Sequence, residues 1–562
     1  MREFNCGEAG THEFAKRQAY LPSDRPLALS SSTANPLTLK QNPAPVLILG
    51  AGINGAALAR ELALNGLGVV LVDTRDIASG ATANSSRLIH GGLRYLEHGE
   101  FPLVRESLAE RTRLLRLAPQ FVRPVRLFIP VRNRFGGVVT AARRFLGRHD
   151  RSRSDRVLHR GLWTVRVGLW IYDRYARESN LPGHASHRST DAGIVPVDRS
   201  KYPWVCSFSD AQILFPERFT LALLRDAEEI ATGTGAEFRV LTYHKATLVG
   251  RTANITRGAT SETVLEFQPS IIVNATGAWV DHTLDALHVE SKRQMGGTKG
   301  SHFVTSHRRL CDLLDGRAVY TEAGDGRPIF ILPFVNQMTL IGTTDELFEG
   351  NPADAAATPG ELAYLVAAVN DVFPGLELTV DDVRLHYAGV RPLPFSDAAD
   401  TGAISRRHWI EPNTHCEVPL YSLIGGKLTT CRSLAEEAAD IILRRLRIER
   451  GANSRERPIE EREPALVATS VAWSNNQSNT ASSETLAGTG ISFDAIKRVI
   501  EHEWVTTLAD LAERRLMLIY HPGLRREALE QLADLLIDAG LLTPAERNDA
   551  VNTIVARWHI RS

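Results

Sequence analysis

Three glycines with the spacing of a dinucleotide-binding turn stand near the start of the chain. Gly50, Gly52 and Gly55 follow the apolar run 46–49, and an alanine-rich stretch, 56–65, comes after them. The first glycine of such a turn allows the tight bend, the second lets the backbone approach a pyrophosphate, and the third lets helix and strand pack closely. The start of the helix then offers free N–H groups and a positive dipole to phosphate oxygens. These residues suit the binding of a nucleotide cofactor.

An acidic residue at the end of the next apolar run strengthens this interpretation. The run 69–72 is predicted as a second buried strand and stops at Asp73. That carboxylate lies about 20 residues beyond the glycines, where such a fold binds a ribose hydroxyl. A glycine-rich turn can also be a plain connection in an α/β protein. Because strand, helix, second strand and acid all occur in order, the pattern favours a ligand-binding turn.

The segment that follows is small and polar, and it leads into a run with several chemically useful side chains. Residues 76–86 carry hydroxyls and amides that suit a loop beneath a second ligand group. Residues 87–97 read RLIHGGLRYLE. This part of the chain resembles the flavin-binding N-terminus of FAD-dependent glycerol-3-phosphate dehydrogenases, within the larger D-amino-acid-oxidase-like group of flavoproteins. The resemblance extends, with gaps, over 45–446 and again over 500–516.

The resemblance implies FAD as cofactor and oxidation of sn-glycerol 3-phosphate to dihydroxyacetone phosphate, by hydride transfer from C2 to flavin N5, with electrons passed to a quinone. Such a reaction requires cations for the dianionic ester, a carbinol carbon held against the flavin, and an acceptor for the hydroxyl proton. Four residues at matching positions are expected to bind the substrate: Arg94, Tyr95, Arg406 and Lys427. His302 is expected to accept the proton, because an unperturbed histidine has a pKa near ~6.5. Arg391 and His90 are the other catalytic candidates.

The residues expected to contact FAD come from the glycine-rich turn, the polar loop and the matching family segments. They are Gly50, Gly52, Ile53, Asn54, Gly55, Asp73, Thr74, Ser79, Ser85, Ser86, Leu88, His90, Gly91, Gly277, Gly389, Gly426, Lys427, Leu428 and Thr429. Taken singly, each cation is more often a surface ion-pair partner and each histidine a satisfied polar residue. Their occurrence together at family positions favours the functional interpretation. No metal site is expected, since the five cysteines show no CxxC pairing.

A chain of 562 residues is longer than one hydrophobic core usually serves. The expected fold class is α/β: a Rossmann-type FAD-binding domain interleaved with an α+β substrate domain of mostly antiparallel sheet, followed by a C-terminal helical domain. The expected division is a disordered extension at 1–44, an FAD-binding domain at 45–125, 200–290 and 385–446, a substrate domain at 126–199 and 291–384, a linker at 447–490, and the helical domain at 491–562.

Several elements are expected from hydrophobic periodicity. Helices are predicted over 101–117, 219–229, 360–372 and 496–519, and strands over 237–249, 301–305, 318–321, 328–334 and 338–345. The helical tail carries no obvious chemistry. It is interpreted as a structural or oligomerising domain, and a homodimer would fit the second interpretation.

Bulk composition narrows the class of protein. The formal net charge is zero and the pI is near 7.3, so nothing suggests a nucleic-acid partner. Scattered cysteines favour a reducing compartment, and no apolar run reaches the ~18 residues of a membrane span. Residues 1–44 lack the pattern of a secretory signal. A cytoplasmic protein is expected.

One basic segment with tryptophans is compatible with a membrane surface. Between residues 111 and 172 the acids are Asp150 and Asp155, while arginines are frequent, and Trp163 and Trp170 lie near its end. On these residues alone, a solvated basic face and an anionic membrane surface are equally good interpretations. The family resemblance favours peripheral attachment to the inner face of the membrane, because these dehydrogenases deliver electrons to membrane quinone.

The chain departs from the family pattern over 207–219 and at Arg407, where the family usually has an acid. These departures leave the substrate and the electron acceptor open. The alternatives are an oxidase of the same substrate that reduces oxygen, a related flavoenzyme acting on another hydroxy acid or amine, and a flavin-binding protein without turnover. An additional cation at Arg407, if it faces the pocket, would favour a larger or more anionic substrate.

Overall fold

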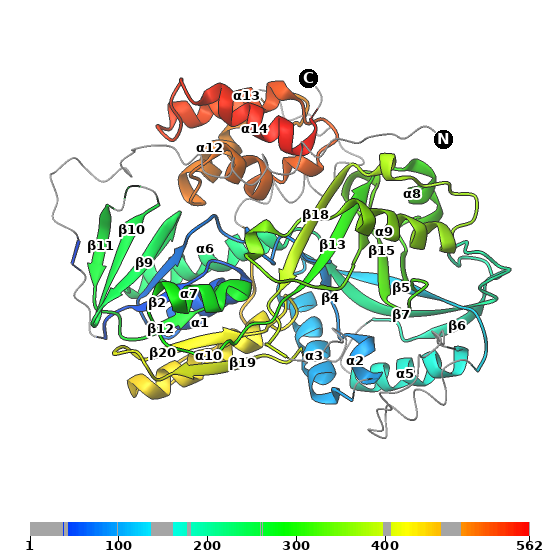
Figure 1. The fold of residues 1–562 in the computed structure, drawn as a ribbon, viewed down its shortest axis with the longest axis horizontal. Helices are drawn as coiled ribbons and strands as arrows, with labels where there is room; N and C mark the ends of the chain where they lie inside the picture. The colour runs from blue at the N-terminus through cyan, green and yellow to red at the C-terminus, as the bar shows by residue number, and fades with distance from the viewer. Residues whose placement is uncertain are drawn as a thin grey trace, which may run out of the picture.

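The computed structural model describes residues 37–38, 43–97, 99–135, 161–176, 181–258, 260, 262–396, 406–461 and 485–560. Within these ranges the chain forms two sheet-based domains side by side and a helical C-terminal domain that rests on both (Figure 1). No helix in this part of the chain combines the length and the apolar character needed to cross a bilayer.

The first domain is built on a six-stranded sheet. Its strand order is β19 (Trp409–Asn413), β20 (Leu420–Ile424), β12 (Ile272–Asn274), β2 (Val46–Leu49), β3 (Val69–Asp73) and β8 (Phe238–Thr242). All neighbours are parallel except β19 and β20, which are antiparallel. Because helices or a second sheet cover both faces, the central strands are buried along their whole length.

Alternate side chains of β2 and β3 point into two different cores. One set packs against α1 (Ile53–Ala63), α6 (Pro216–Thr234) and α10 (Cys431–Leu446). The other set packs against α7 (Val280–Ala286) and a four-stranded sheet, whose order is β1 (Leu37–Thr38), β11 (Thr263–Phe267), β10 (Thr252–Arg257) and β9 (His244–Val249). The result is a three-layer domain whose strand ends meet at one edge (Figure 1).

Two local expectations in this domain needed correction. The helix predicted over 56–65 begins at Ile53 and ends at Ala63. The single strand predicted over 237–249 is two strands, because Tyr243 between them has φ of +62°. β8 continues the six-stranded sheet and β9 belongs to the four-stranded sheet.

The second domain is built on a ten-stranded, mostly antiparallel sheet. Its main order is β17 (Glu346–Leu347), β13 (Thr298–Thr305), β16 (Met338–Gly342), β15 (Pro328–Phe334), β14 (Ala318–Glu322), β5 (Val122–Val131), β7 (Trp204–Ile213) and β4 (Leu88–Ile89). β18 (Leu385–Arg391) also pairs with β13, and β6 (Ala185–Arg188) pairs with β7. The pair β5 and β14 is parallel. The antiparallel strands predicted over 301–345 are present here.

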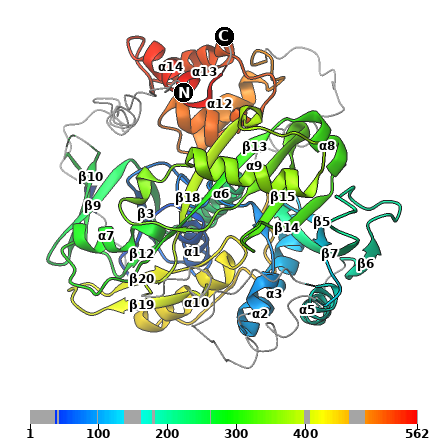
Figure 2. The same cartoon turned by 45° about the vertical axis from the view of Figure 1, so that its right-hand side comes forward.

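Helices cover both faces of this sheet. α9 (Pro359–Val372), which begins with the capping box of Thr358 and Glu361, packs with α8 (Arg308–Leu314) on one face. α2 (Leu93–Glu97), α3 (Phe101–Leu117) and α5 (Leu162–Tyr175) lie on the other (Figures 1 and 2). The helix expected over 101–117 has these bounds in the structure.

The expected domain boundaries change at several places, and β4, which lies in 45–125, is one of them because it pairs with β7. β7 lies in 200–290 and β18 in 385–446, both assigned to the FAD-binding domain, yet both pair with strands of the ten-stranded sheet. β5 crosses the boundary expected at residue 125. The reason is that strand partners distant in sequence, and not the local pattern, decide which sheet a segment joins.

The C-terminal domain contains shorter elements than expected: α12 (Phe493–His502), the turns η6 (Asp510–Arg515) and η7 (Leu518–Tyr520), α13 (Arg526–Asp538) and α14 (Arg547–Trp558). The prediction of a continuous helix over 496–519 is wrong. Trp504 and Met517 have φ of +51° and +53°, which an α-helix does not allow. The Asp510 carboxylate accepts hydrogen bonds from the amides of Thr506 and Thr507 and starts a new turn there.

The expected linker and extension are only partly described. Residues 450–461 pack on the first domain, where Arg457 and Arg60 both pair with Asp226, and Arg450 pairs with Glu61. This part of the expected linker is therefore an ordered segment that packs on the first domain. Residues 462–484 lie outside the described residues. So does the extension 1–44, apart from 37–38 and 43–44.

Candidate active site

A cavity of about 690 Å³ lies at the ends of β2, β3 and β12 in the first domain. The glycine-rich turn forms one side of it. Gly50 has φ of +106°, and a Cβ there would lie 2.7 Å from the carbonyl oxygen of Ala275. Only glycine allows this bend and this close approach to the neighbouring strand end. The turn directs the N-terminus of α1, with its free amides, into the cavity.

Asp73 stands at the end of β3 on the cavity wall. Its carboxylate accepts hydrogen bonds from the amides of Ala51 and Arg75, both at 2.8 Å. Burial raises its pKa, and these two hydrogen bonds oppose that effect. The carboxylate is therefore held in one orientation at the position where a ribose hydroxyl would bind.

The polar loop after β3 forms the opposite wall. Ser79, Asn84, Ser85 and Ser86 of this loop all line the cavity. Thr82 Oγ1 accepts a hydrogen bond of 3.1 Å from the amide of Ile53, the first residue of α1. Sequence reasoning missed Thr82. No local signal identifies it, since the contact joins residues 29 positions apart.

Buried polar atoms without partners show what kind of group the cavity fits. Asn54 Oδ1 and Lys427 Nζ, both from residues that line the cavity, are buried and make no hydrogen bond. Gly426, with φ of +89°, brings the backbone against Asn54. A buried ammonium without an acceptor is costly unless a ligand supplies one. A large polar cofactor such as FAD carries phosphate and carbonyl oxygens that can accept from Lys427 Nζ, and hydroxyls that can donate to Asn54 Oδ1.

The residues predicted to contact the cofactor mostly come together here. All of them line the cavity except Gly55 and Gly91. A Cβ on Gly55 would lie 2.0 Å from the carbonyl oxygen of Gly50, and one on Gly91 would meet Leu108 and Tyr172 at 2.6 Å. These two glycines therefore allow close packing behind the cavity and do not face it.

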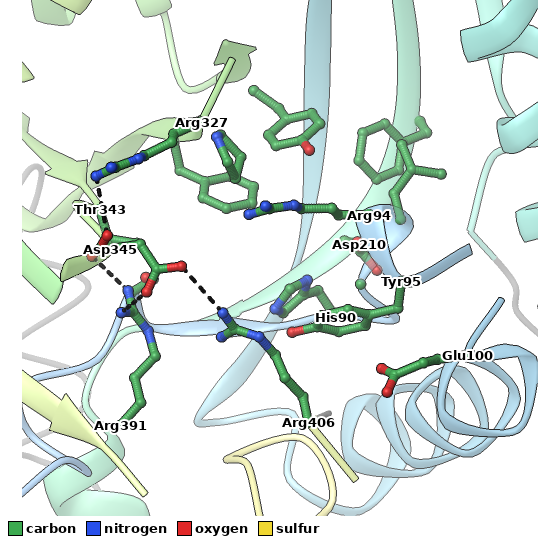
Figure 3. Close-up of a pocket in the computed structure, with 17 residues that line it drawn as sticks. His90, Arg94, Tyr95, Glu100, Asp210, Arg327, Thr343, Asp345, Arg391 and Arg406 are labelled. Atoms are coloured by element: carbon green, nitrogen blue, oxygen red, sulfur yellow. Dashed lines mark hydrogen bonds and ion pairs between the residues drawn. The ribbon is translucent and has the colours of Figure 1, made fainter. Parts of the chain in front are cut away.

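A second, smaller cavity of about 290 Å³ adjoins the first (Figure 3). Five residues line both of them: Ser86, His90, Tyr95, Arg391 and Arg406. The predicted substrate residue Arg94 also lines the small cavity. Lys427 lines the large one, with its Nζ 4.0 Å above the centre of the Tyr95 ring. Arg94 and three cations from the stretch 391–427 thus surround the junction of the two cavities.

Asp345, which sequence reasoning missed, connects two of these cations. Its carboxylate lies 2.9 Å from Arg391 Nη1 and 3.4 Å from Arg406 Nη2. Arg391 Nη2 also donates to Thr343 Oγ1 at 2.9 Å (Figure 3). The same atom donates to the carbonyl of Thr344 at 3.0 Å. Burial raises the pKa of Asp345, but the two arginines outweigh it and lower that pKa overall.

Arg391 keeps its charge although it is partly buried. Burial lowers the pKa of Arg391 to about 10, so the guanidinium is protonated at neutral pH. Burial also lowers the pKa of Lys427. The Tyr95 phenol has its pKa raised by burial, and the charges of Lys427 and Arg406 outweigh this and lower it overall. The field at the junction therefore favours anions.

The two histidine candidates are neutral. Burial lowers the pKa of His302 to about 3, helped by Arg391 and Arg87. Burial lowers the pKa of His90 to about 3 as well, helped by Lys427 and Arg406. Both values are far below the pKa near ~6.5 that was expected from an unperturbed histidine.

The placement of His302 also differs from the expectation. Its ring stacks on Tyr387 at 5.0 Å, and its Nε2 lies 2.9 Å from Ser86 Oγ. His302 lines the large cavity only, whereas Ser86 lines both. The imidazole therefore reaches the small cavity through the Ser86 hydroxyl.

The two departures from the family pattern have different outcomes. Arg407 is exposed and is not among the residues that line either cavity, so it does not add a cation to the pocket. Asp210, from the segment 207–219, does line the small cavity. Its carboxylate accepts hydrogen bonds from Arg111 and from the Tyr172 hydroxyl, both at 2.7 Å.

Comparison with known proteins places this fold and site in a class. The family model for FAD dependent oxidoreductases matches residues 45–441, which is well over half of the chain. The chain therefore belongs to the family of FAD-dependent oxidoreductases, and FAD is its cofactor. The predicted flavoprotein fold and cofactor are confirmed.

Individual relatives narrow the comparison further. The chain is 36% identical over 422 residues to a glycerol-3-phosphate dehydrogenase of Synechocystis sp., covering 72% of this chain and 70% of the relative. It is 33% identical over 398 residues to a D-erythritol 1-phosphate dehydrogenase of Brucella abortus, covering 70% and 72%. Among solved structures, it is similar in fold to the glycerol-3-phosphate dehydrogenase from Bacillus halodurans complexed with FAD, with a TM-score of 0.63, 19% identity, and coverage of 92% and 94%.

Proposed function

We propose that this chain oxidises sn-glycerol 3-phosphate to dihydroxyacetone phosphate with FAD as cofactor. The observation that carries the proposal is the small cavity lined by arginines, which opens onto the cavity that fits FAD. The relatives named glycerol-3-phosphate dehydrogenase support the same substrate.

The cations at the junction suit the phosphate of this substrate. Arg94 and Arg406 offer planar guanidinium groups, which bind phosphate oxygens with two donors each. Both Nη atoms of Arg391 already donate within the protein, so Arg391 contributes mainly its positive charge. Asp345 restrains Arg406 as well as Arg391, so this part of the pocket needs little reorganisation when the ester binds. In this proposal the phosphate lies at these arginines and the carbinol carbon faces the large cavity.

Oxidation of the carbinol removes a hydride from C2 and a proton from its hydroxyl. Bound FAD supplies the acceptor of the hydride. We assign the proton to His302, because its imidazole is neutral and reaches the small cavity through the Ser86 hydroxyl. In this step the Ser86 hydroxyl accepts the proton of the carbinol and gives its own proton to His302 Nε2.

Anaerobic mixing of the purified holoenzyme with glycerol 3-phosphate tests the substrate. The flavin absorbance near its visible maximum should bleach with this substrate and less with a four-carbon polyol phosphate, a hydroxy acid or an amine. Faster bleaching by the four-carbon ester would favour the substrate of the Brucella relative instead. A flavin that none of these compounds reduces would support a flavin-binding protein without turnover.

The electron acceptor in this proposal is a membrane quinone, reached by peripheral attachment to the cytoplasmic face of a membrane. The supporting feature is α5, where Trp163, Val167 and Trp170 are 47%, 56% and 61% exposed. Their spacing puts them on one side of the helix, and the Arg166 guanidinium lies 4.9 Å above the Trp163 ring. Exposed tryptophans beside arginines suit the boundary between lipid headgroups and acyl chains.

Two measurements separate this acceptor and this surface from their alternatives. Turnover with a soluble quinone should exceed turnover with oxygen, and a peroxide yield matching substrate consumption would favour an oxidase. The double variant Trp163→Ser/Trp170→Ser should lose binding to phosphatidylglycerol vesicles. Val249→Ser, which removes an equally exposed apolar side chain from β9, should retain it.

A further inference from the structure

The polar loop between β3 and β4 ends in a buried charged residue on each side. We call residues 76–87 the flavin loop, because most of them line the large cavity. Asp76 and Arg87 stand at its two ends, and each is only 1% exposed. A buried charge needs a partner of opposite sign, so the partners of these two residues determine how the loop is held.

The partners of Asp76 come from the C-terminal domain. Arg515 donates two hydrogen bonds to the carboxylate, from Nη1 to Oδ2 at 2.6 Å and from Nη2 to Oδ1 at 2.8 Å. Arg514 adds a bond from Nε to Oδ2. Both arginines belong to η6, about 440 positions away in sequence, as the separations of 438 and 439 show.

Arg515 is itself fixed within the C-terminal domain. It is fully buried and donates to the carbonyl oxygens of Glu503 at 2.8 Å and Trp504 at 3.0 Å. These carbonyls are available because α12 has ended just before them, at His502. A continuous helix was expected here. Because it breaks after His502, two free carbonyl oxygens hold Arg515 in an orientation that reaches the flavin loop.

The other end of the loop is held in a comparable way. Arg87 forms a two-pronged ion pair with Glu217, at 3.0 and 2.7 Å, and donates to the carbonyl of Leu214 at 2.6 Å. It also donates to the hydroxyl of Tyr520 in η7 at 3.0 Å. The carbonyl of Tyr520 accepts a hydrogen bond of 2.8 Å from Asn336 of the second domain.

We propose that the C-terminal domain completes the cofactor site by holding both ends of the flavin loop, with Arg515 and Tyr520 as its positioning residues. Neither side chain lines the cavity, so both act through Asp76 and Arg87. The loop between these anchors carries the hydroxyls and amides that face the cofactor, including Ser79, Ser85 and Ser86. This assigns the tail a role in cofactor binding, where its sequence indicated only a structural or oligomerising domain.

The contacts of Arg515 and Tyr520 predict weaker FAD binding while the arginines of the small cavity stay in place. A general loss of stability would affect both. Losing the hydroxyl of Tyr520 or the charge of Arg515 should loosen the loop in the protein without cofactor and weaken FAD binding. The small cavity should keep its arginines, because Asp345 holds them independently of the C-terminal domain. Binding of FAD is measured without substrate, so the outcome is independent of the proposed substrate.

The experiment compares Tyr520→Phe and Arg515→Gln with wild type in the full-length protein. The dissociation constant for FAD, measured by flavin fluorescence after cofactor removal, should rise roughly tenfold for Arg515→Gln and roughly threefold for Tyr520→Phe. Amide hydrogen exchange of residues 76–87 in the cofactor-free protein should accelerate in both variants. The control is Arg547→Gln, which removes an exposed ion pair with Asp534 inside the same domain and should change neither quantity.

Tyr520→Phe decides the question if Arg515→Gln does not fold, because it keeps the ring that packs on Phe215 and Phe334. The proposal is overturned if the variants that fold bind FAD within about twofold of wild type and exchange loop amides at the wild-type rate. It is also overturned if the control weakens FAD binding as much as they do, since the effect would then belong to the stability of the domain.

Discussion

Asp345 illustrates how one side chain organises the chemistry of this protein. It comes from the segment after β16, while Arg391 ends β18 and Arg406 precedes β19, and its carboxylate contacts both guanidinium groups. An acid beside a phosphate-binding pocket lowers the positive charge of the pocket, but it also fixes the directions of the donors. We expect orientation to matter more, because a planar fork binds phosphate well only when it is aligned.

Asp345→Asn tests this balance. The amide keeps the size of the side chain but no longer pairs with two cations, so KM for glycerol 3-phosphate should rise roughly tenfold, with a smaller change in kcat. Steady-state kinetics with an unchanged flavin spectrum would check it. Asp325→Asn is the matched control, because it removes an exposed pair with Arg327 at the edge of the same cavity. A KM below that of wild type would mean that Asp345 mainly repels the phosphate.

The pH dependence of the reaction follows from the shifted pKa values. The pKa of His302 is lowered to about 3, so its imidazole is neutral and able to accept a proton above pH ~5. It loses this ability only when it becomes protonated near pH 3. Arg391 has its pKa lowered to about 10, so its charge is present below that pH and lost above it. kcat should therefore be flat between about pH 5 and 9. kcat/KM should fall above about pH 10, where Arg391 loses its charge. It should also fall below pH ~6, because a phosphate ester binds its second proton near that pH.

Rate profiles recorded with a pH-stable soluble acceptor would check this. An acid limb in kcat near pH 6.5 would contradict it, because the proton acceptor would then behave as an ordinary solvated histidine. His302→Asn with unchanged turnover and flavin content would remove His302 from the assignment.

The elements around the cofactor cavity depend on close contacts between backbones. α1 starts directly at the glycine-rich turn and packs between α6 and α10, so it has little freedom to move away from β2. The carbonyl of Gly50 faces the position where a side chain on Gly55 would begin. The spacing of the glycines thus sets the distance between helix and strand, and with it the direction of the amides that face the cavity.

Gly55→Ala should reduce the FAD retained per chain after purification by roughly tenfold or more, because a Cβ within 2.0 Å of the Gly50 carbonyl oxygen must displace α1. The ratio of flavin to protein absorbance measures this directly. Gly360→Ala, in the first turn of α9 where a Cβ meets no atom within 4 Å, should retain full cofactor. Equal retention in both variants would show that α1 tolerates the added methyl group.

Across the molecule, the large cavity is lined by segments from both sheet domains, and its flavin loop is anchored to the C-terminal domain. A ligand in such a place stabilises every part that must come together to bind it. The buried ion pairs of Arg218 with Glu461 and Glu503 also join α6 of the first domain to the segment 450–461 and to the C-terminal domain. Cofactor binding and the docking of the three domains should therefore be coupled.

Removal of FAD should lower the thermal unfolding temperature of the whole protein in one cooperative step. A ligand at about 100 times its dissociation constant stabilises the folded state by about 2.7 kcal/mol, and added FAD should restore the lost stability with its logarithmic concentration dependence. Differential scanning calorimetry of the cofactor-free and reconstituted protein would check this. A separate transition at lower temperature, whose midpoint does not change with FAD concentration, would show that one domain unfolds independently of the cofactor site.

Local patterns identified the glycine-rich turn, the strands on both sides of it, Asp73 and helix 101–117, because each depends on neighbours within a few residues. Family positions identified four of the cations that line the cavities, Arg94, Arg391, Arg406 and Lys427, but not Arg327. Packing alone determined that Asp345 pairs with two arginines and that both histidines are neutral. It also determined that β7 and β18 join the ten-stranded sheet and that the C-terminal domain reaches Asp76. Periodicity and turn chemistry record the short-range preferences of a chain. Burial, shifted pKa values and ion pairs between distant segments exist only after the chain has folded, because they depend on which surfaces exclude water together.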